Sequence, residues 1–141
     1  MVYDLLIRNA NVLDGSGAAH FRADVAIQSE RICAIGDMPY ATATTIIDAQ
    51  ERYLAPGFID VHTHDDTNVI RTPEMLPKLT QGITTVVVGN CGISASPVTL
   101  TREVPDHMNL LGKLEDFRYP SFIAYANAVY AAAPSINVTA L

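Results

Sequence analysis

The chain has 141 residues, a mass of 15.2 kDa and a net charge of −6; 49% of its residues are hydrophobic and 17% are charged. This composition excludes intrinsic disorder, which needs low hydrophobicity and high net charge. The acidic balance argues against binding to nucleic-acid phosphates, and no apolar run reaches the roughly 18 residues of a membrane span. The chain is still apolar for a free-standing domain, where about 25% charged residues are usual, and one explanation is that it is part of a larger protein.

Two cysteines, Cys33 and Cys91, are too few for a disulfide scaffold. Asp4 and Arg8 interrupt the start of the chain, which therefore lacks the pattern of a secretion signal. We expect reduced thiols and a cytoplasmic protein. Cys33 falls in an alternating strand pattern and is predicted to be a packing residue.

Short alternating apolar segments, separated by turn residues, occupy the first 54 residues. They predict strands at residues 3–10, 24–28, 31–35 and 45–48. Strands spaced roughly 8–12 residues apart are typical of a small antiparallel sheet or sandwich.

The pattern changes after Leu54. A Pro-Gly turn is followed by a strand at residues 58–64, a helical stretch at residues 73–81 that Gly82 ends, and an apolar β-branched strand at residues 83–88. This order predicts a βαβ unit whose strands are parallel and adjacent, and whose second strand is buried on both faces.

The last third of the chain is irregular up to about residue 119. A helix is possible near residues 108–114, and a second helix is predicted at residues 121–133, with Ser121 as its N-cap and Pro134 as its stop. We expect the apolar stripe of this second helix to pack in the core; its members are Phe122, Tyr125, Val129 and Ala133. Residues 136–141 predict the start of a third strand.

Two histidines, His62 and His64, stand at the end of the first of these parallel strands. Residues i and i+2 of a strand share a face, so the two imidazoles should project together, with Asp60 on the same face. Neutral imidazole suits Zn, Fe, Ni or Cu, although two unrelated histidines at a strand end remain an alternative. The position favours metal binding, because active sites of parallel α/β sheets lie at the carboxyl ends of strands.

Cys91 follows the second strand within Gly89-Asn90-Cys91-Gly92, about one βαβ unit after His62. Neighbouring parallel strands lie about 4.8 Å apart, so one small cation could contact both histidines and this thiol. A buried, inert cysteine is the alternative, and spacing alone does not decide between the two. A nucleophilic thiol has less support, since no base and orienting group can be assigned to it.

Other polar residues are weaker candidates. Asp65 is expected to orient a histidine from outside the ligand set. We expect His20 to lie in a loop without a partner, and His107 to be a solvated surface residue.

The segment Ala-Pro-Gly-Phe-Ile-Asp-Val-His-Thr-His, at residues 55–64, resembles the signature of the amidohydrolase superfamily. Residues 77–87 and 89–94, which include Gly-Asn-Cys-Gly, are similar to the D-aminoacylases, the N-acyl-D-amino-acid deacylases. The resemblance covers essentially the whole chain. It implies an α/β fold in which part of a small β-sandwich, residues 1–54, precedes an incomplete metal-dependent hydrolase (β/α)8 barrel, residues 55–141, truncated at its third strand.

The resemblance also implies a zinc site. His62 and His64 match the first-strand metal ligands, and Cys91 matches a cysteine that binds zinc in this group. In the family, a metal-activated water attacks the amide of a small-molecule N-acyl-D-amino acid, which yields a D-amino acid and a carboxylate. The family's other histidine ligands and its catalytic aspartate lie on later strands, so we assign no catalytic residue here and expect the 141-residue chain alone to be inactive.

Two further interpretations stay open. The chain could be a non-catalytic truncated fragment that binds metal, or part of another amidohydrolase such as a dihydroorotase-like cyclic amidase, although Gly-Asn-Cys-Gly argues against the latter. We expect no nucleic-acid or membrane partner. The sequence does not predict the oligomeric state or the preferred substrate side chain.

Overall fold

A computed structural model describes residues 2–141 of the chain. The chain divides into two compact units, Met1–Pro56 and Gly57–Leu141. Each unit has its own sheet and its own apolar cluster. Their assignment to a β-sandwich and a barrel stays a prediction.

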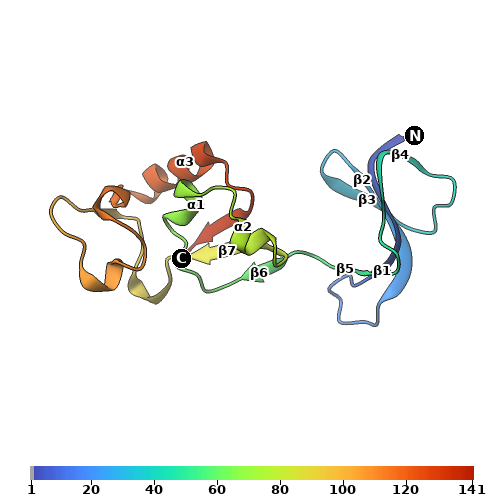
Figure 1. The fold of residues 1–141 in the computed structure, drawn as a ribbon, viewed down its shortest axis with the longest axis horizontal. Helices are drawn as coiled ribbons and strands as arrows, with labels where there is room; N and C mark the ends of the chain where they lie inside the picture. Colours follow the sequence, from blue (N-terminus) through green and yellow to red (C-terminus); the bar gives the residue numbers. More distant parts are fainter. Residues whose placement is uncertain (1) are drawn as a thin grey trace. The chain divides into compact units, whose positions relative to one another are not determined.

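The N-terminal unit is one five-stranded mixed sheet (Figure 1). Its strands are β1 (Val2–Val12), β2 (Phe21–Gln28), β3 (Arg31–Gly36), β4 (Thr42–Asp48) and β5 (Tyr53–Leu54). The order is β3-β2-β1-β4, with β5 also pairing with β1. The β1–β2 and β2–β3 pairs are antiparallel, whereas β4 and β5 run parallel to β1. The expectation of an antiparallel sheet is therefore wrong in part, because the chain crosses from β3 to the far side of β1.

The core of this sheet is formed by small and β-branched side chains. Ala10, Val12, Ala23 and Val25 form a buried cluster. Cys33 does not join it: its side chain is exposed, and its sulfur lies 3.3 Å from the carbonyl oxygen of Ala26. The prediction that Cys33 is a packing residue is therefore wrong.

The C-terminal unit is built on three parallel strands in the order β10-β7-β6. They are β6 (Phe58–Asp60), β7 (Ile83–Val88) and β10 (Asn137–Ala140), and two short strands, β8 (Val98–Thr99) and β9 (Arg118–Tyr119), pair separately. The helices α1 (Asn68–Arg71), α2 (Leu76–Leu79) and α3 (Phe122–Ala132) lie on one side of the three-stranded sheet (Figure 1). The predicted parallel βαβ unit and third strand are confirmed.

The helices differ from the sequence prediction in extent. The 73–81 stretch is helical only at α2, which carries Pro77 in its first turn, where the missing N–H costs least. α1 was not predicted. The 108–114 region holds only short 3₁₀ turns, at Asp106–Met108 and Leu114–Asp116. The third helix is confirmed, and the Ser121 hydroxyl accepts a hydrogen bond from the backbone N–H of Ala124 at 3.3 Å.

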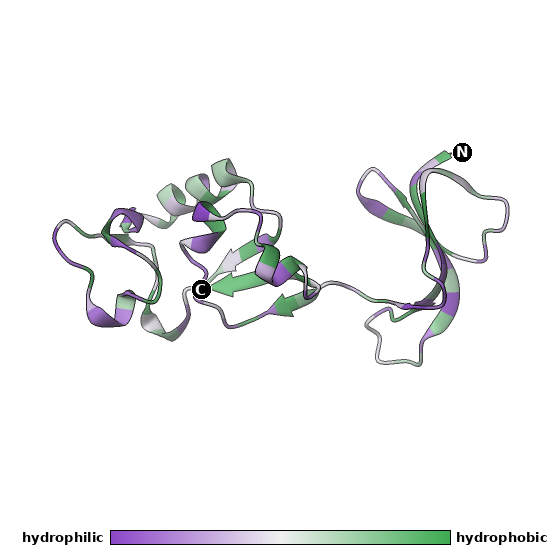
Figure 2. Cartoon of the chain, viewed as in Figure 1, coloured by the Kyte–Doolittle hydropathy of each residue, from purple (hydrophilic) through white to green (hydrophobic). Residues whose placement is uncertain are grey.

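The core of the C-terminal unit lies between this sheet and its helices. Val86 and Val88 are fully buried there, and Figure 2 shows β7 as an apolar strand. Thr85 and Val87, on the opposite face of this strand, are only half-buried. The prediction of burial on both faces is thus wrong for β7 as described.

The apolar stripe of α3 is only partly in this core. Tyr125 is buried, whereas Phe122 and Ala133 are exposed and line a hollow of about 820 Å³ between α3 and β10. The packing prediction therefore fails at those two positions.

No helix within residues 2–141 is long and apolar enough to cross a membrane.

Candidate metal centre

The segment that carries both histidines begins where β6 ends. The strand stops at Asp60, so His62 and His64 lie in the irregular segment after it, not on the strand as predicted. The segment still runs alongside β7, because the backbone N–H of Thr63 donates to the carbonyl oxygen of Val87 at 3.1 Å. This pairing keeps the alternation of side chains between the two faces: Thr63 is buried, whereas His62 and His64 on either side of it are more exposed.

His62, His64 and Cys91 converge at this end of the sheet. One ligand atom from each lies within 4.8 Å of those of the other two. The Nε2 atom of His62 is 3.0 Å from the Sγ atom of Cys91, within hydrogen-bond distance. The two imidazole rings meet edge to face, with centroids 5.7 Å apart. The structure thus brings together the three residues that the sequence singled out.

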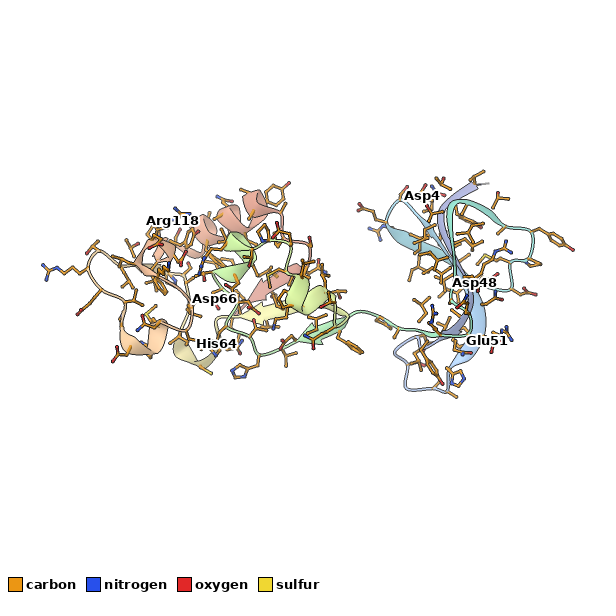
Figure 3. The ribbon with its side chains drawn as sticks, in the orientation of Figure 1. Asp4, Asp48, Glu51, His64, Asp66 and Arg118 are labelled. Atoms are coloured by element: carbon orange, nitrogen blue, oxygen red, sulfur yellow. The ribbon has the colours of Figure 1, made fainter. Side chains whose placement is uncertain are left out.

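The exposure of the three side chains suits a site at the rim of a sheet. His62 and Cys91 are exposed, whereas His64 is half-buried, and Figure 3 labels it in the segment that follows β6. The Nδ1 atom of His64 is buried and has no hydrogen-bond partner among the described residues. A buried imidazole nitrogen without a partner loses its hydration, so a ligand that takes its lone pair would be favourable.

The cysteine is held in an uncommon backbone conformation. Cys91 has φ 60° and ψ 19°, and Gly89, two residues earlier, has φ 84°. Left-handed backbone is easy for glycine and uncommon for cysteine. The turn therefore fixes the direction of the Cys91 side chain by backbone geometry that its own residue type disfavours.

A lysine ammonium joins the two ends of the histidine segment. Lys78 Nζ lies 2.8 Å from Oδ2 of Asp60 and 3.1 Å from Oδ2 of Asp65. The hydrogen bond from Lys78 lowers the pKa of Asp60, against the effect of burial. Burial acts to lower the pKa of Lys78, but its hydrogen bonds to both carboxylates outweigh burial and raise it. The ion pairs hold the chain on both sides of the histidines.

Asp60 was predicted to share the face of the histidines and Asp65 to orient one of them, and the structure shows neither. Asp60 faces Lys78 and is not among the converging ligand atoms. The Asp65 carboxylate accepts from Asn68 Nδ2 at 3.0 Å and pairs with Lys78, so it contacts these residues instead of orienting a histidine.

Asp66 is the most deeply buried acid of this region, with no exposed surface. Its Oδ1 atom accepts the backbone N–H of Ala95 at 3.2 Å, which ties the histidine segment to the segment that follows Cys91. The Tyr125 hydroxyl donates to the Asp66 carbonyl oxygen at 2.8 Å. Burial, followed by the charge of Asp66, raises the pKa of Tyr125, so the phenol stays protonated as a donor.

The other histidines lie away from this cluster. His107 is exposed, as predicted. His20 was expected to lack a partner, but its ring meets that of Tyr53 edge to face, with centroids 5.1 Å apart.

Two residues of the site, Asn90 and Lys78, were not predicted from the sequence. The position of Asn90 between a glycine and the candidate ligand was an available signal, whereas nothing in the sequence marked Lys78.

A family model and several known proteins match this chain. The amidohydrolase family model matches residues 45–141. The chain is 45% identical over 138 residues to N-acyl-D-aspartate deacylase, and 46% identical over 138 residues to N-acyl-D-glutamate deacylase, both of Alcaligenes xylosoxydans xylosoxydans. Each match covers 98% of this chain and 28% of the relative.

Two solved structures match nearly the whole chain. One is a D-aminoacylase, with a TM-score of 0.93 and 39% identity, and the match covers 99% of this chain and 29% of that one. The other is N-acyl-D-glutamate deacylase from Bordetella bronchiseptica, complexed with zinc and a phosphonate inhibitor that mimics the tetrahedral intermediate. Its TM-score is 0.92 at 42% identity, over 100% of this chain and 29% of that one. The chain therefore spans less than a third of the relatives it matches. Because the family model covers more than half of its residues, the chain belongs to the amidohydrolase family.

Proposed function

We propose that His62, His64 and Cys91 are three ligands of a zinc ion. The observation that carries this proposal is the convergence of their ligand atoms within 4.8 Å, from two segments that follow neighbouring parallel strands. Ligand atoms of a tetrahedral zinc site lie roughly 3.3–3.6 Å apart, given Zn–N of about 2.0–2.1 Å and Zn–S of about 2.3 Å. The distance of 3.0 Å between His62 Nε2 and Cys91 Sγ is shorter than that spacing, and the limit of 4.8 Å for all three atoms is longer, so the observed distances bracket it.

The chemistry of these donors fits zinc. Two imidazoles and one thiolate form a mixed nitrogen and sulfur set, which excludes the oxygen-preferring ions calcium and magnesium. The imidazole of His64 is half-buried at the site, and its Nδ1 atom has no hydrogen-bond partner among the described residues. The zinc bound in the Bordetella bronchiseptica N-acyl-D-glutamate deacylase supports the same choice of metal.

Bound zinc supplies Lewis acidity and lowers the pKa of a water ligand, the chemistry that amide hydrolysis needs. The residues of this chain fix where that chemistry happens. His62 and Cys91 approach the site from the segments that follow two neighbouring strands, and both side chains are exposed, so a small molecule can reach the site. Lys78 holds the ends of the histidine segment through its two ion pairs.

The whole protein that contains this chain is inferred to hydrolyse N-acyl-D-amino acids to a D-amino acid and a carboxylate. Support comes from relatives named as N-acyl-D-aspartate and N-acyl-D-glutamate deacylases that match 98% of the chain. In this proposal β6, β7 and β10 are the first strands of a (β/α)8 barrel, and β1–β5 are part of a β-sandwich. A cytoplasmic location remains a prediction from the sequence.

Zinc content tests the metal site directly. The chain, purified with zinc and dialysed, is expected to retain about one zinc ion, and Cys91→Ala is expected to retain far less. Cys33→Ala is the matched control, because it removes the other exposed thiol. Equal zinc contents in the wild type and Cys91→Ala would overturn the ligand role of Cys91.

Activity tests the substrate class. The chain joined at Leu141 to the remainder of the N-acyl-D-aspartate deacylase should hydrolyse N-acetyl-D-aspartate or another N-acetyl-D-amino acid and spare the L-enantiomers. The 141-residue chain alone, with added zinc, should release no product. Turnover of N-acetyl-D-methionine by that chain would contradict the expectation that these residues need the rest of a barrel.

A further inference from the structure

The two segments that carry the candidate ligands are joined by side chains that are not ligands. Asn90 Nδ2 donates to the carbonyl oxygen of Val87 at 2.8 Å and to that of Thr63 at 3.3 Å. Both hydrogens of the amide group are thus directed to carbonyl oxygens, one in each segment. Asn90 is 7% exposed, so water does not readily replace these bonds.

This bridge lies between the residues that must meet. Thr63, whose carbonyl oxygen accepts from Asn90, stands between His62 and His64 in the chain. Asn90 directly precedes Cys91, whose left-handed backbone directs its sulfur to within 3.0 Å of His62. A strained conformation persists only where its surroundings determine it. Here the buried carboxamide anchors the residue just before the strained one.

We infer that Asn90 is a positioning residue of the metal site: it holds Cys91 opposite His62 and His64 and so sets the metal affinity without touching the metal. This inference rests on the proposed zinc site. Groups that orient metal ligands from behind typically change metal affinity by about 10- to 100-fold when removed. Asn90 acts on the ligand set as a whole, because its two bonds fix the spacing between the segments.

Cobalt(II), titrated into the metal-free chain, is the probe. Thiolate ligation gives a sulfur-to-cobalt charge-transfer band, whereas ligation by histidines alone does not. In the wild type we expect this band. In Asn90→Ala we expect about 10- to 100-fold weaker binding and a diminished band even at saturating cobalt. General destabilisation would weaken nitrogen and sulfur ligation alike, so the loss of the band at saturation identifies positioning.

Two further variants make the test decisive. Asn90→Asp keeps the shape of the side chain but loses both donors and turns a charge toward two carbonyl oxygens, so it should bind cobalt as weakly as Asn90→Ala. Far-ultraviolet circular dichroism of each variant shows that the chain is folded before cobalt is added. Asn137→Ala is the matched control: its carboxamide donates to the carbonyl oxygen of Thr84 at 3.2 Å, toward the start of the same strand β7. It should bind cobalt like the wild type.

The outcomes separate the two claims. A wild-type chain without a charge-transfer band would overturn the proposed cysteine ligation and this inference with it. A normal wild-type band, together with unchanged affinity and band in both Asn90 variants, would overturn the inference alone. Weakened binding in Asn137→Ala equal to that in Asn90→Ala would also overturn it, because the effect would then not be specific to the site.

Discussion

Each unit of this chain exposes one cysteine, yet among residues 2–141 only the C-terminal unit places metal-binding groups around its cysteine. Cys33 lies on β3, an edge strand of a sheet, and its sulfur is near a backbone carbonyl oxygen. Cys91 follows β7, where the segment after the neighbouring parallel strand brings two imidazoles to it. The difference is one of topology: parallel strands deliver their carboxyl ends, and the loops that follow them, to a single edge.

The largest expected effect that separates the units is stabilisation by zinc. A ligand that binds only the folded state stabilises it by about 4 kcal/mol at a thousand-fold excess over Kd. Hydrogen exchange with zinc, compared with exchange in the presence of a chelator, should show added protection in residues 61–66 and 89–95 and none in β1–β5. Equal added protection in both units would show that zinc is not confined to the predicted site.

A cavity in the N-terminal core should leave metal binding unchanged. Leu6 has no exposed surface in β1, so Leu6→Ala should cost about 3 kcal/mol in the free energy of unfolding of that unit. Leu110, 65% exposed, provides the control variant Leu110→Ala. Urea unfolding should show the loss, and a zinc titration should give the wild-type Kd. A weaker Kd in Leu6→Ala would mean that the site depends on the N-terminal sheet.

A smaller effect is expected at α3, within the unit that carries the site. Ser121→Ala removes the hydroxyl that caps this helix and should cost about 1 kcal/mol. Hydrogen exchange in residues 122–132 should rise, while exchange in β1–β5 should not change. Ser135→Ala is the control, since the exposed Ser135 donates through its backbone N–H, which alanine retains. Equal hydrogen exchange in Ser121→Ala and Ser135→Ala would show that the Ser121 hydroxyl does not stabilise α3.

The smallest expected effect is a change with pH in the stability of the N-terminal unit. The hydrogen bond from Asn9, followed by that from the backbone N–H of Gln50, lowers the pKa of Asp48 below 3.8. A lowered folded-state pKa gives stability that is present above the unfolded-state value and is lost as the pH falls through the folded-state value. Asp48→Ala should therefore melt slightly below the wild type at pH 7, and the gap should be narrower at pH 3. A gap that is equal at both pH values would contradict this assignment.

The sequence predicted the parts of this molecule that local patterns determine. The strand β7 and the capped helix α3 each depend on neighbouring residues, and the structure contains both. The convergence of His62, His64 and Cys91 could also be predicted, because parallel pairing constrains where strand ends lie.

Contacts between residues that are far apart in the chain could not be predicted from the sequence. The parallel pairing of β4 with β1 depends on a crossing that no local pattern encodes. Lys78 forms its ion pairs with Asp60 and Asp65 only when α2 packs beside the strands. The residues next to Lys78 in the sequence do not indicate these pairs. The bridge made by Asn90 likewise needs the histidine segment to lie next to β7.

X-ray absorption spectroscopy of the zinc-loaded chain tests the central claim most directly, because it reports the atoms bound to the metal. The account predicts one sulfur at about 2.3 Å together with nitrogen or oxygen ligands at about 2.0–2.1 Å, and loss of the sulfur shell in Cys91→Ala but not in Cys33→Ala. A first shell of nitrogen and oxygen alone in the wild type would contradict it.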